Sequence, residues 1–112
     1  MISSHGLTEA TVAQIAGVLA RFRDVDRATL FGSRAKGTHK RGSDIDLALE
    51  GDALDWRTVG RIYDALDDLL LPHRFSLVIF ESSTDPDVAA HISRVGVTLF
   101  ERKHTGRALL RT

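Results

Sequence analysis

The stretch Phe31–Leu49, FGSRAKGTHKRGSDIDLAL, contains the residues that decide the fold and the chemistry of this chain. An apolar run ends at the pair Gly32 and Ser33, and a basic loop that contains glycine follows it. Asp44 and Asp46 then alternate with aliphatic residues, and residues two apart on a strand point to the same face. We therefore expect a strand–loop–strand unit whose second strand carries two carboxylates on one face and apolar side chains on the other.

The two aspartates predict a metal site. Two carboxylates on one face raise each other's pKa unless a cation joins them, and hard oxygen ligands select Mg²⁺ or Mn²⁺. Gly32 and Ser33 can begin a helix whose first N–H groups point at an anion. A metal site and an anion site joined by one short loop suit a nucleoside triphosphate with its Mg²⁺. The alternative for Asp44 and Asp46 is a strand end with two solvated aspartates.

The loop between the two predicted strands supplies further candidates for phosphate binding. Glycine permits close backbone approach to a phosphate, serine adds a hydroxyl, and the cations neutralise charge. The predicted phosphate-binding residues are Gly32, Ser33, Arg34, Lys36, Lys40 and Ser43, with Arg41 as a further loop cation. The alternatives are an ordinary serine-capped turn and solvated surface charges, so we expect only one or two of the cations to contact phosphate.

The rest of the chain predicts an α/β (α+β) fold, with a small mixed sheet flanked by helices. Apolar spacing predicts helices over Leu7–Phe22, from a cap at Asp55 to Leu71, and from Pro86, capped by Asp85, to Gly96. One turn of helix is expected at Ser33–Lys36. Strands are expected at Val25–Phe31, Ile45–Leu49 and Phe75–Phe80, and Val97–Phe100 is expected to dock as a final extended segment. The first two strands are expected to be antiparallel neighbours.

Composition bounds the function classes. The chain has 112 residues, so one domain is expected, over 1–102, followed by a basic tail over 103–112. It has 15 basic and 15 acidic residues, which gives no overall attraction to nucleic acid or to a membrane surface. It has no cysteine, which excludes thiolate metal sites and a cysteine nucleophile. With no signal peptide and no apolar run long enough for a membrane span, we expect a cytoplasmic protein.

The pattern Gly32-Ser33, ten residues, then Asp44-Ile45-Asp46 resembles the signature of the DNA polymerase β-type nucleotidyltransferase superfamily. The small size resembles its minimal nucleotidyltransferase (MNT) branch. The likeness continues through LDDLLLPHRFSLVIF and DPDVAAHISRVGVTLFER, so it covers about Ala28 to Arg102. The resemblance implies the polymerase β-like fold, with Asp44 and Asp46 as catalytic metal ligands.

The same resemblance implies the ligands and the partner. ATP is expected as substrate or ligand with Mg²⁺ or Mn²⁺. The acceptor of the nucleotide is expected to be a HEPN-domain ribonuclease toxin, bound in a hetero-oligomer in which this chain is the antitoxin. The tail, with Leu109 and Leu110 among its basic residues, is expected to order on that partner; a frayed terminus is the alternative.

Ser76 departs from the family pattern. A third aspartate usually occupies this position, where it completes a second metal site and helps activate the attacking hydroxyl. Serine is neutral and a poor metal ligand, and the residues on its face, Val78 and Phe80, supply no substitute carboxylate. Removing one preorganised electrostatic group typically costs about 10²–10³ in rate.

Three interpretations therefore remain. In the first, the chain is an MNT-like enzyme that transfers a nucleotide, as Gly32-Ser33 and Asp44-Ile45-Asp46 favour. In the second, it is a catalytically weak or inactive nucleotide-binding antitoxin that inhibits by contact, as Ser76 favours. The third is an unrelated small α/β domain. His91 is expected to face a partner or cap its helix, and Trp56 is expected to pack.

Overall fold

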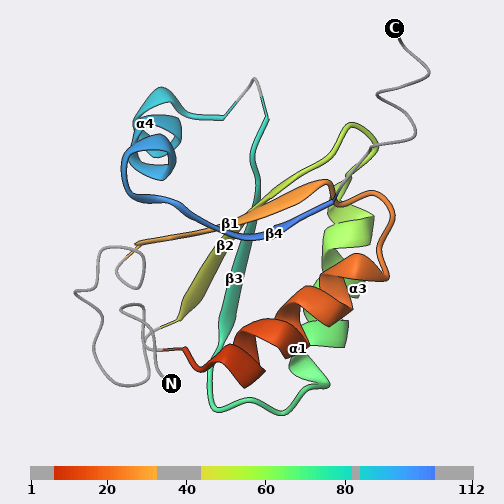
Figure 1. The fold of residues 1–112 in the computed structure, drawn as a ribbon. Helices are drawn as coiled ribbons and strands as arrows, with labels where there is room; N and C mark the ends of the chain where they lie inside the picture. The colour runs from red at the N-terminus through yellow and green to blue at the C-terminus, as the bar shows by residue number, and fades with distance from the viewer. Residues whose placement is uncertain (1–6, 33–43, 82–83, 103–112) are drawn as a thin grey trace, which may run out of the picture.

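The computed structural model describes residues 7–32, 44–81 and 84–102 (Figure 1). The chain runs through α1 (Glu9–Ala20), β1 (Arg27–Phe31), β2 (Ile45–Glu50), α3 (Trp56–Asp67), β3 (Phe75–Ile79), α4 (Pro86–Val95) and β4 (Val97–Glu101). The predicted order of helices and strands is confirmed. The predicted turn of helix at Ser33–Lys36 lies outside the described residues.

The strands form one mixed sheet in the order β3-β2-β1-β4. β1 is antiparallel to both β2 and β4, which confirms the predicted antiparallel pair, and β2 is parallel to β3. The segment that was expected to dock as extended chain is β4, an edge strand on β1. Two antiparallel pairs and one parallel pair, whose strands are joined through α3, give the predicted mixed sheet.

The two faces of the sheet differ. The aliphatic residues of β2, Ile45, Leu47 and Leu49, are 0% exposed and belong to the hydrophobic core under α1 and α3. Figure 1 shows α1 and α3 together on this side of the sheet and α4 on the other. Because side chains alternate along a strand, Asp46 projects to the side of α4, as predicted. The core thus fixes the face on which the acidic side chain lies.

Helix ends follow the predicted capping chemistry. The Asp55 carboxylate accepts a hydrogen bond from the Thr58 N–H (2.8 Å), and the Asp85 carboxylate accepts one from the Asp87 N–H (2.8 Å) ahead of α4. Such caps satisfy N–H groups that have no partner inside the helix. α3 was predicted to reach Leu71, and this is wrong, because the helix ends at Asp67.

The end of α3 has a physical reason. Leu70 adopts a left-handed backbone conformation (φ 55°) that cannot continue a right-handed helix. The bend leaves Leu70 88% exposed, while Leu69 and Leu71 on either side pack against the core.

The last described residue, Arg102, ties the end of the sheet to the end of α1. Its guanidinium donates hydrogen bonds to the carbonyl oxygens of Val25 (3.1 Å), Phe22 (3.0 Å) and Ala20 (3.3 Å). It also lies 5.4 Å from the ring centroid of Phe100. Arg102 is therefore part of the domain, and the predicted tail, 103–112, lies outside the described residues. Within the described ranges, no helix has the length and apolar character that crossing a membrane requires.

Candidate functional site

The strand register brings three predicted site positions together. Phe31, the last residue of β1, pairs with Asp46 on β2, and Asp46 pairs with Ser76 on β3. Gly32 follows Phe31 directly, so Gly32, Asp46 and Ser76 meet at one end of the sheet. We call this the Gly32 end. The register makes these positions neighbours, and their shared role in a site stays a prediction.

Gly32 and the Asp46 carboxylate are packed against each other. Gly32 has a positive φ of 76°, a conformation that residues with a Cβ rarely adopt. A Cβ built on Gly32 would overlap Oδ2 of Asp46 and lie only 3.1 Å from its Cγ. The positive φ favours glycine here, and any Cβ would also force the Asp46 carboxylate to move. The sequence predicted close backbone approach at Gly32 but assigned it to a phosphate.

The Gly32 N–H has a partner inside the protein. It donates a hydrogen bond to Nε2 of His91 at 3.3 Å. The expectation that this N–H points at an anion is therefore wrong for Gly32. The same expectation for Ser33 lies outside the described residues.

The two aspartates differ in their surroundings. Asp44 precedes β2 and is exposed, whereas Asp46 lies within β2 and is half-buried. No cluster of three or more His, Asp or Glu side chains suited to a metal ion occurs in residues 7–32, 44–81 and 84–102. Mg²⁺ is commonly held by one or two carboxylates, with substrate phosphates and water as its other ligands. Asp44 and Asp46 are two positions apart at the Gly32 end, and two such carboxylates fit that set of ligands.

Ser76 stands where the family resemblance implies a third carboxylate. It lies beside Asp46 in the parallel register and is half-buried. On the core side, its neighbour Phe75 is only 8% exposed, which directs Ser76 to the face of Asp46. The strand β3, with the sequence FSLVI, contains no acidic residue.

Most of the predicted phosphate-binding residues cannot be placed. Ser33, Arg34, Lys36, Lys40, Arg41 and Ser43 fall in the segment 33–43, outside the described residues. Their assignment stays a prediction. Both ends of that segment are described: it leaves β1 at Gly32 and returns at Asp44, so it begins and ends at the Gly32 end.

Sequence analysis missed the contact that His91 makes. We expected this side chain to face a partner or to cap its helix. Instead, α4 carries the imidazole to the Gly32 end, where its ring also meets Phe31 edge-on (centroids 6.3 Å apart, interplanar angle 80°). The two residues of the Gly32–His91 hydrogen bond are 59 positions apart in the chain, so no local pattern signals the contact.

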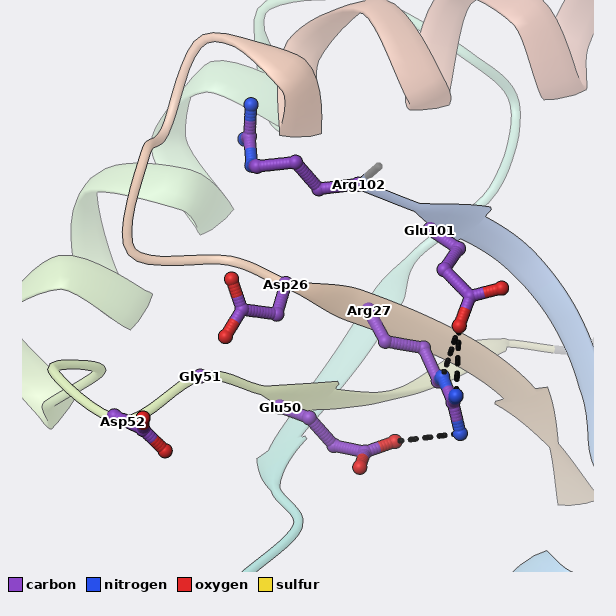
Figure 2. A pocket seen from close by; sticks show the side chains of 7 residues that line it. All are labelled: Asp26, Arg27, Glu50, Gly51, Asp52, Glu101 and Arg102. Carbon is purple, nitrogen blue, oxygen red and sulfur yellow. Dashed lines mark hydrogen bonds and ion pairs between the residues drawn. The ribbon is translucent and has the colours of Figure 1, made fainter. Parts of the chain in front are cut away.

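A different pocket lies at the opposite end of β1 and β2, roughly 13 Å away along the strands (Figure 2). We call this end of the two strands the Arg27 end. Arg27 donates two hydrogen bonds to Glu101 Oε2, at 2.7 and 3.2 Å, and lies 3.9 Å from Glu50. The hydrogen bond to Glu101, with the charges of Glu101 and Glu50, raises the pKa of Arg27. The pocket has a volume of about 300 Å³ and holds no predicted site residue.

An apolar groove runs along α3 and the edge strand β3. Trp56, Tyr63 and Leu77 are among the side chains that line it, and its volume is about 400 Å³. Trp56 was expected to pack, and this is wrong, because its side chain is 63% exposed. Trp56 is the first residue of α3.

The fold has solved counterparts. A toxin–antitoxin complex with AMP-PNP contains a chain that superposes with a TM-score of 0.67 and 24% identity, over 87% of this chain and 78% of that chain. A tri-AMPylated Shewanella oneidensis HEPN toxin in complex with an MNT antitoxin gives a TM-score of 0.65 and 19% identity, over 91% and 79%. An MntA–HepT toxin–antitoxin complex gives 0.64 and 21%, over 85% and 74%. At these identities the likeness establishes the fold.

Sequence comparisons define the family. The chain is 36% identical over 76 residues to the Haemophilus influenzae protein named probable protein adenylyltransferase MntA. That match covers 67% of this chain and 66% of the relative, so it spans just under two thirds of the relative's length. The family model for polymerase beta nucleotidyltransferases matches residues 13–105, which include every site position discussed above. The chain therefore belongs to the polymerase beta nucleotidyltransferase family.

Proposed function

We propose that this protein is an MNT-type nucleotidyltransferase that transfers a nucleotide from Mg-ATP to a HEPN-type toxin and thereby acts as its antitoxin. The observation that carries the proposal is the contact between Gly32 and the Asp46 carboxylate, in register with Ser76 on the neighbouring strand. A glycine in a positive φ conformation that leaves room for one carboxylate is a specific arrangement, whereas two solvated aspartates would not require it.

The proposed reaction is a displacement at the α-phosphorus of ATP. The oxygen of an acceptor hydroxyl forms a bond to phosphorus, the bond to the bridging oxygen breaks, pyrophosphate leaves, and the hydroxyl proton passes to water. A divalent cation, when bound, supplies positive charge for the phosphate oxygens in the transition state. Asp44 and Asp46 are the residues that would hold it. The basic loop over 33–43 is the proposed source of further phosphate contacts.

The relatives support the acceptor and the partner. One curated relative is named as a protein adenylyltransferase, and the solved counterparts include a complex with AMP-PNP and a complex with a tri-AMPylated HEPN toxin. We extend the HEPN acceptor and the hetero-oligomer to this chain on that basis. ATP and Mg²⁺ are the proposed substrate and cation.

A second candidate function has one specific observation in its favour. Ser76 stands beside Asp46, where the family resemblance implies a third carboxylate. With serine at this position, β3 has no strong base that could accept the proton of the acceptor hydroxyl. A nucleotide-binding antitoxin that inhibits its toxin by contact is the alternative that follows.

The deciding experiment is incubation with ATP labelled at the α-phosphate, Mg²⁺ and the HEPN-type product of the neighbouring gene. Transfer of label to that protein is the expected result. A stable complex without label would support the contact antitoxin, and neither label nor complex would contradict both functions.

The variant Ser76→Asp sharpens the choice between the two functions. If the missing carboxylate limits catalysis, the transfer rate should rise by about 10-fold or more, because one preorganised electrostatic group is typically worth 10²–10³. The matched control is Ser76→Asn, which is similar in size but uncharged. A fast wild type with no gain in Ser76→Asp would show that another group performs this task.

A further inference from the structure

His91 connects α4 to the Gly32 end. It is half-buried on α4, and its Nε2 accepts the Gly32 N–H at 3.3 Å. For Nε2 to accept this bond, the ring proton must sit on Nδ1. The ring also meets Phe31 edge-on, so one side chain contacts the last residue of β1 and the glycine that follows it.

The backbone at Gly32 needs such a contact. Glycine populates positive and negative φ about equally, so the residue type permits the observed φ of 76° but does not select it. The Asp46 carboxylate fills the space beside the Gly32 Cα. The hydrogen bond to His91 holds the N–H of the same residue.

We propose that His91 is a positioning residue of the nucleotide site, which fixes Gly32 against Asp46 through the acceptor Nε2. The inference rests on the proposed function, because it assigns His91 to the nucleotide site described above. His91 acts through Gly32, whose N–H it holds and whose Cα lies against the Asp46 carboxylate.

Two features of His91 can be separated by substitution. His91→Gln keeps a hydrogen-bond acceptor at a similar reach and loses the aromatic ring. His91→Phe keeps the ring, and with it the edge-on contact to Phe31, but loses the acceptor. If His91 acts by its acceptor, Gln should preserve function better than Phe. If it acts only by packing, the order should be reversed.

The first measurement is amide exchange at Gly32 in the nucleotide-free protein, followed by NMR. Loss of one hydrogen bond should speed exchange by about 3- to 10-fold in His91→Phe, while His91→Gln stays near wild type. The second measurement is the affinity for Mg-ATP, which should weaken by a similar factor in His91→Phe and recover in His91→Gln. If His91→Phe does not fold, His91→Leu replaces it, since leucine also lacks an acceptor.

The outcomes separate this inference from the proposed function. No binding of Mg-ATP by the wild type contradicts the proposed function, and the role of His91 in the nucleotide site falls with it. In that case the exchange data still decide whether His91 holds Gly32. Suppose that the wild type binds Mg-ATP. The positioning role is overturned if His91→Phe has the exchange rate and the affinity of the wild type, or if it binds Mg-ATP more tightly than His91→Gln does. The proposed function stands in either case.

Discussion

At the Arg27 end of the sheet, Arg27 lies between Glu50 and Glu101, and Arg102 is surrounded by three backbone carbonyl groups. At the Gly32 end, Asp46 lies against Gly32 and beside Ser76. Both arginines at the Arg27 end are held by groups of the described fold. At the Gly32 end, the Asp46 carboxylate lies so close to Gly32 that a Cβ on that residue would overlap it. We therefore expect substitutions at the Arg27 end to change stability, and substitutions at the Gly32 end to change the proposed binding of Mg-ATP.

Removing a pair of carboxylates should distinguish the two ends most strongly. Mg-ATP is expected to raise the melting temperature of the wild type, and Asp44→Asn with Asp46→Asn should abolish that rise, because the proposed cation would lose both ligands. The matched control is Glu50→Gln with Asp52→Asn, which neutralises two acidic residues of the same spacing at the Arg27 end. Thermal unfolding with and without Mg-ATP is the measurement. An unchanged rise in the first double variant would contradict the metal assignment.

Adding one methyl group at Gly32 should have the next largest effect. Gly32→Ala places a Cβ on a positive φ backbone and against the Asp46 carboxylate, which should destabilise the fold by about 2 kcal/mol or more. The variant should also lose the response to Mg-ATP. Gly17→Ala is the control, since a Cβ there meets nothing within 4 Å and lies within α1, where alanine should stabilise by up to about 1 kcal/mol. Denaturant unfolding gives both values, and a Gly32→Ala variant as stable as wild type would contradict the close contact.

Much of this organisation was predictable, because it is written in local patterns. The alternation around Asp44 and Asp46 predicted which face is acidic, and the burial of the aliphatic residues of β2 agrees. The caps at Asp55 and Asp85 depend on residues within three positions, so short-range sequence rules found them. The placement of Ser76 beside Asp46 followed from the family resemblance and not from periodicity.

The rest depends on contacts that sequence spacing does not encode. The Gly32 N–H donates a hydrogen bond to His91, which is 59 positions away in the chain. Arg102 donates one to the carbonyl oxygen of Ala20, which is 82 positions away. Arg102 was the last residue of the predicted domain, but its three carbonyl partners arise only when β4 lies beside the end of α1. At α3, apolar spacing continued past Asp67, but it does not signal the left-handed conformation that Leu70 adopts after the helix ends.

At the Arg27 end, Arg102 should matter more than Arg27, although both are arginines. Arg102→Ala removes hydrogen bonds from a charged group to three carbonyl oxygens, so we expect a loss of about 2 kcal/mol in the free energy of unfolding. Arg27→Ala breaks an ion pair whose side chains are 46% and 55% exposed, and such pairs contribute about 1 kcal/mol or less. Denaturant unfolding compares the two, and neither variant should change the response to Mg-ATP. If Arg27→Ala lost more free energy of unfolding than Arg102→Ala, Arg27 and not Arg102 would be the more important arginine for stability.

The smallest expected effect concerns the charge of the α3 cap, near the Arg27 end. The hydrogen bond from the Thr58 N–H, helped by the Thr58 side chain, lowers the pKa of Asp55. A lowered pKa in the folded state means that the ionised carboxylate contributes stability above its unfolded pKa of about 3.9, and that this contribution is lost as the pH falls through the folded pKa. Asn and Ser also cap helices but carry no charge, so Asp55→Asn and Asp55→Ser keep the cap and remove the titration. The stability difference between wild type and either variant should therefore be present near pH 6 and shrink toward pH 3, measured by denaturant unfolding at each pH. A difference that does not change with pH in both variants would show that the cap acts by shape alone, and that the Arg27 end draws no stability from this charge.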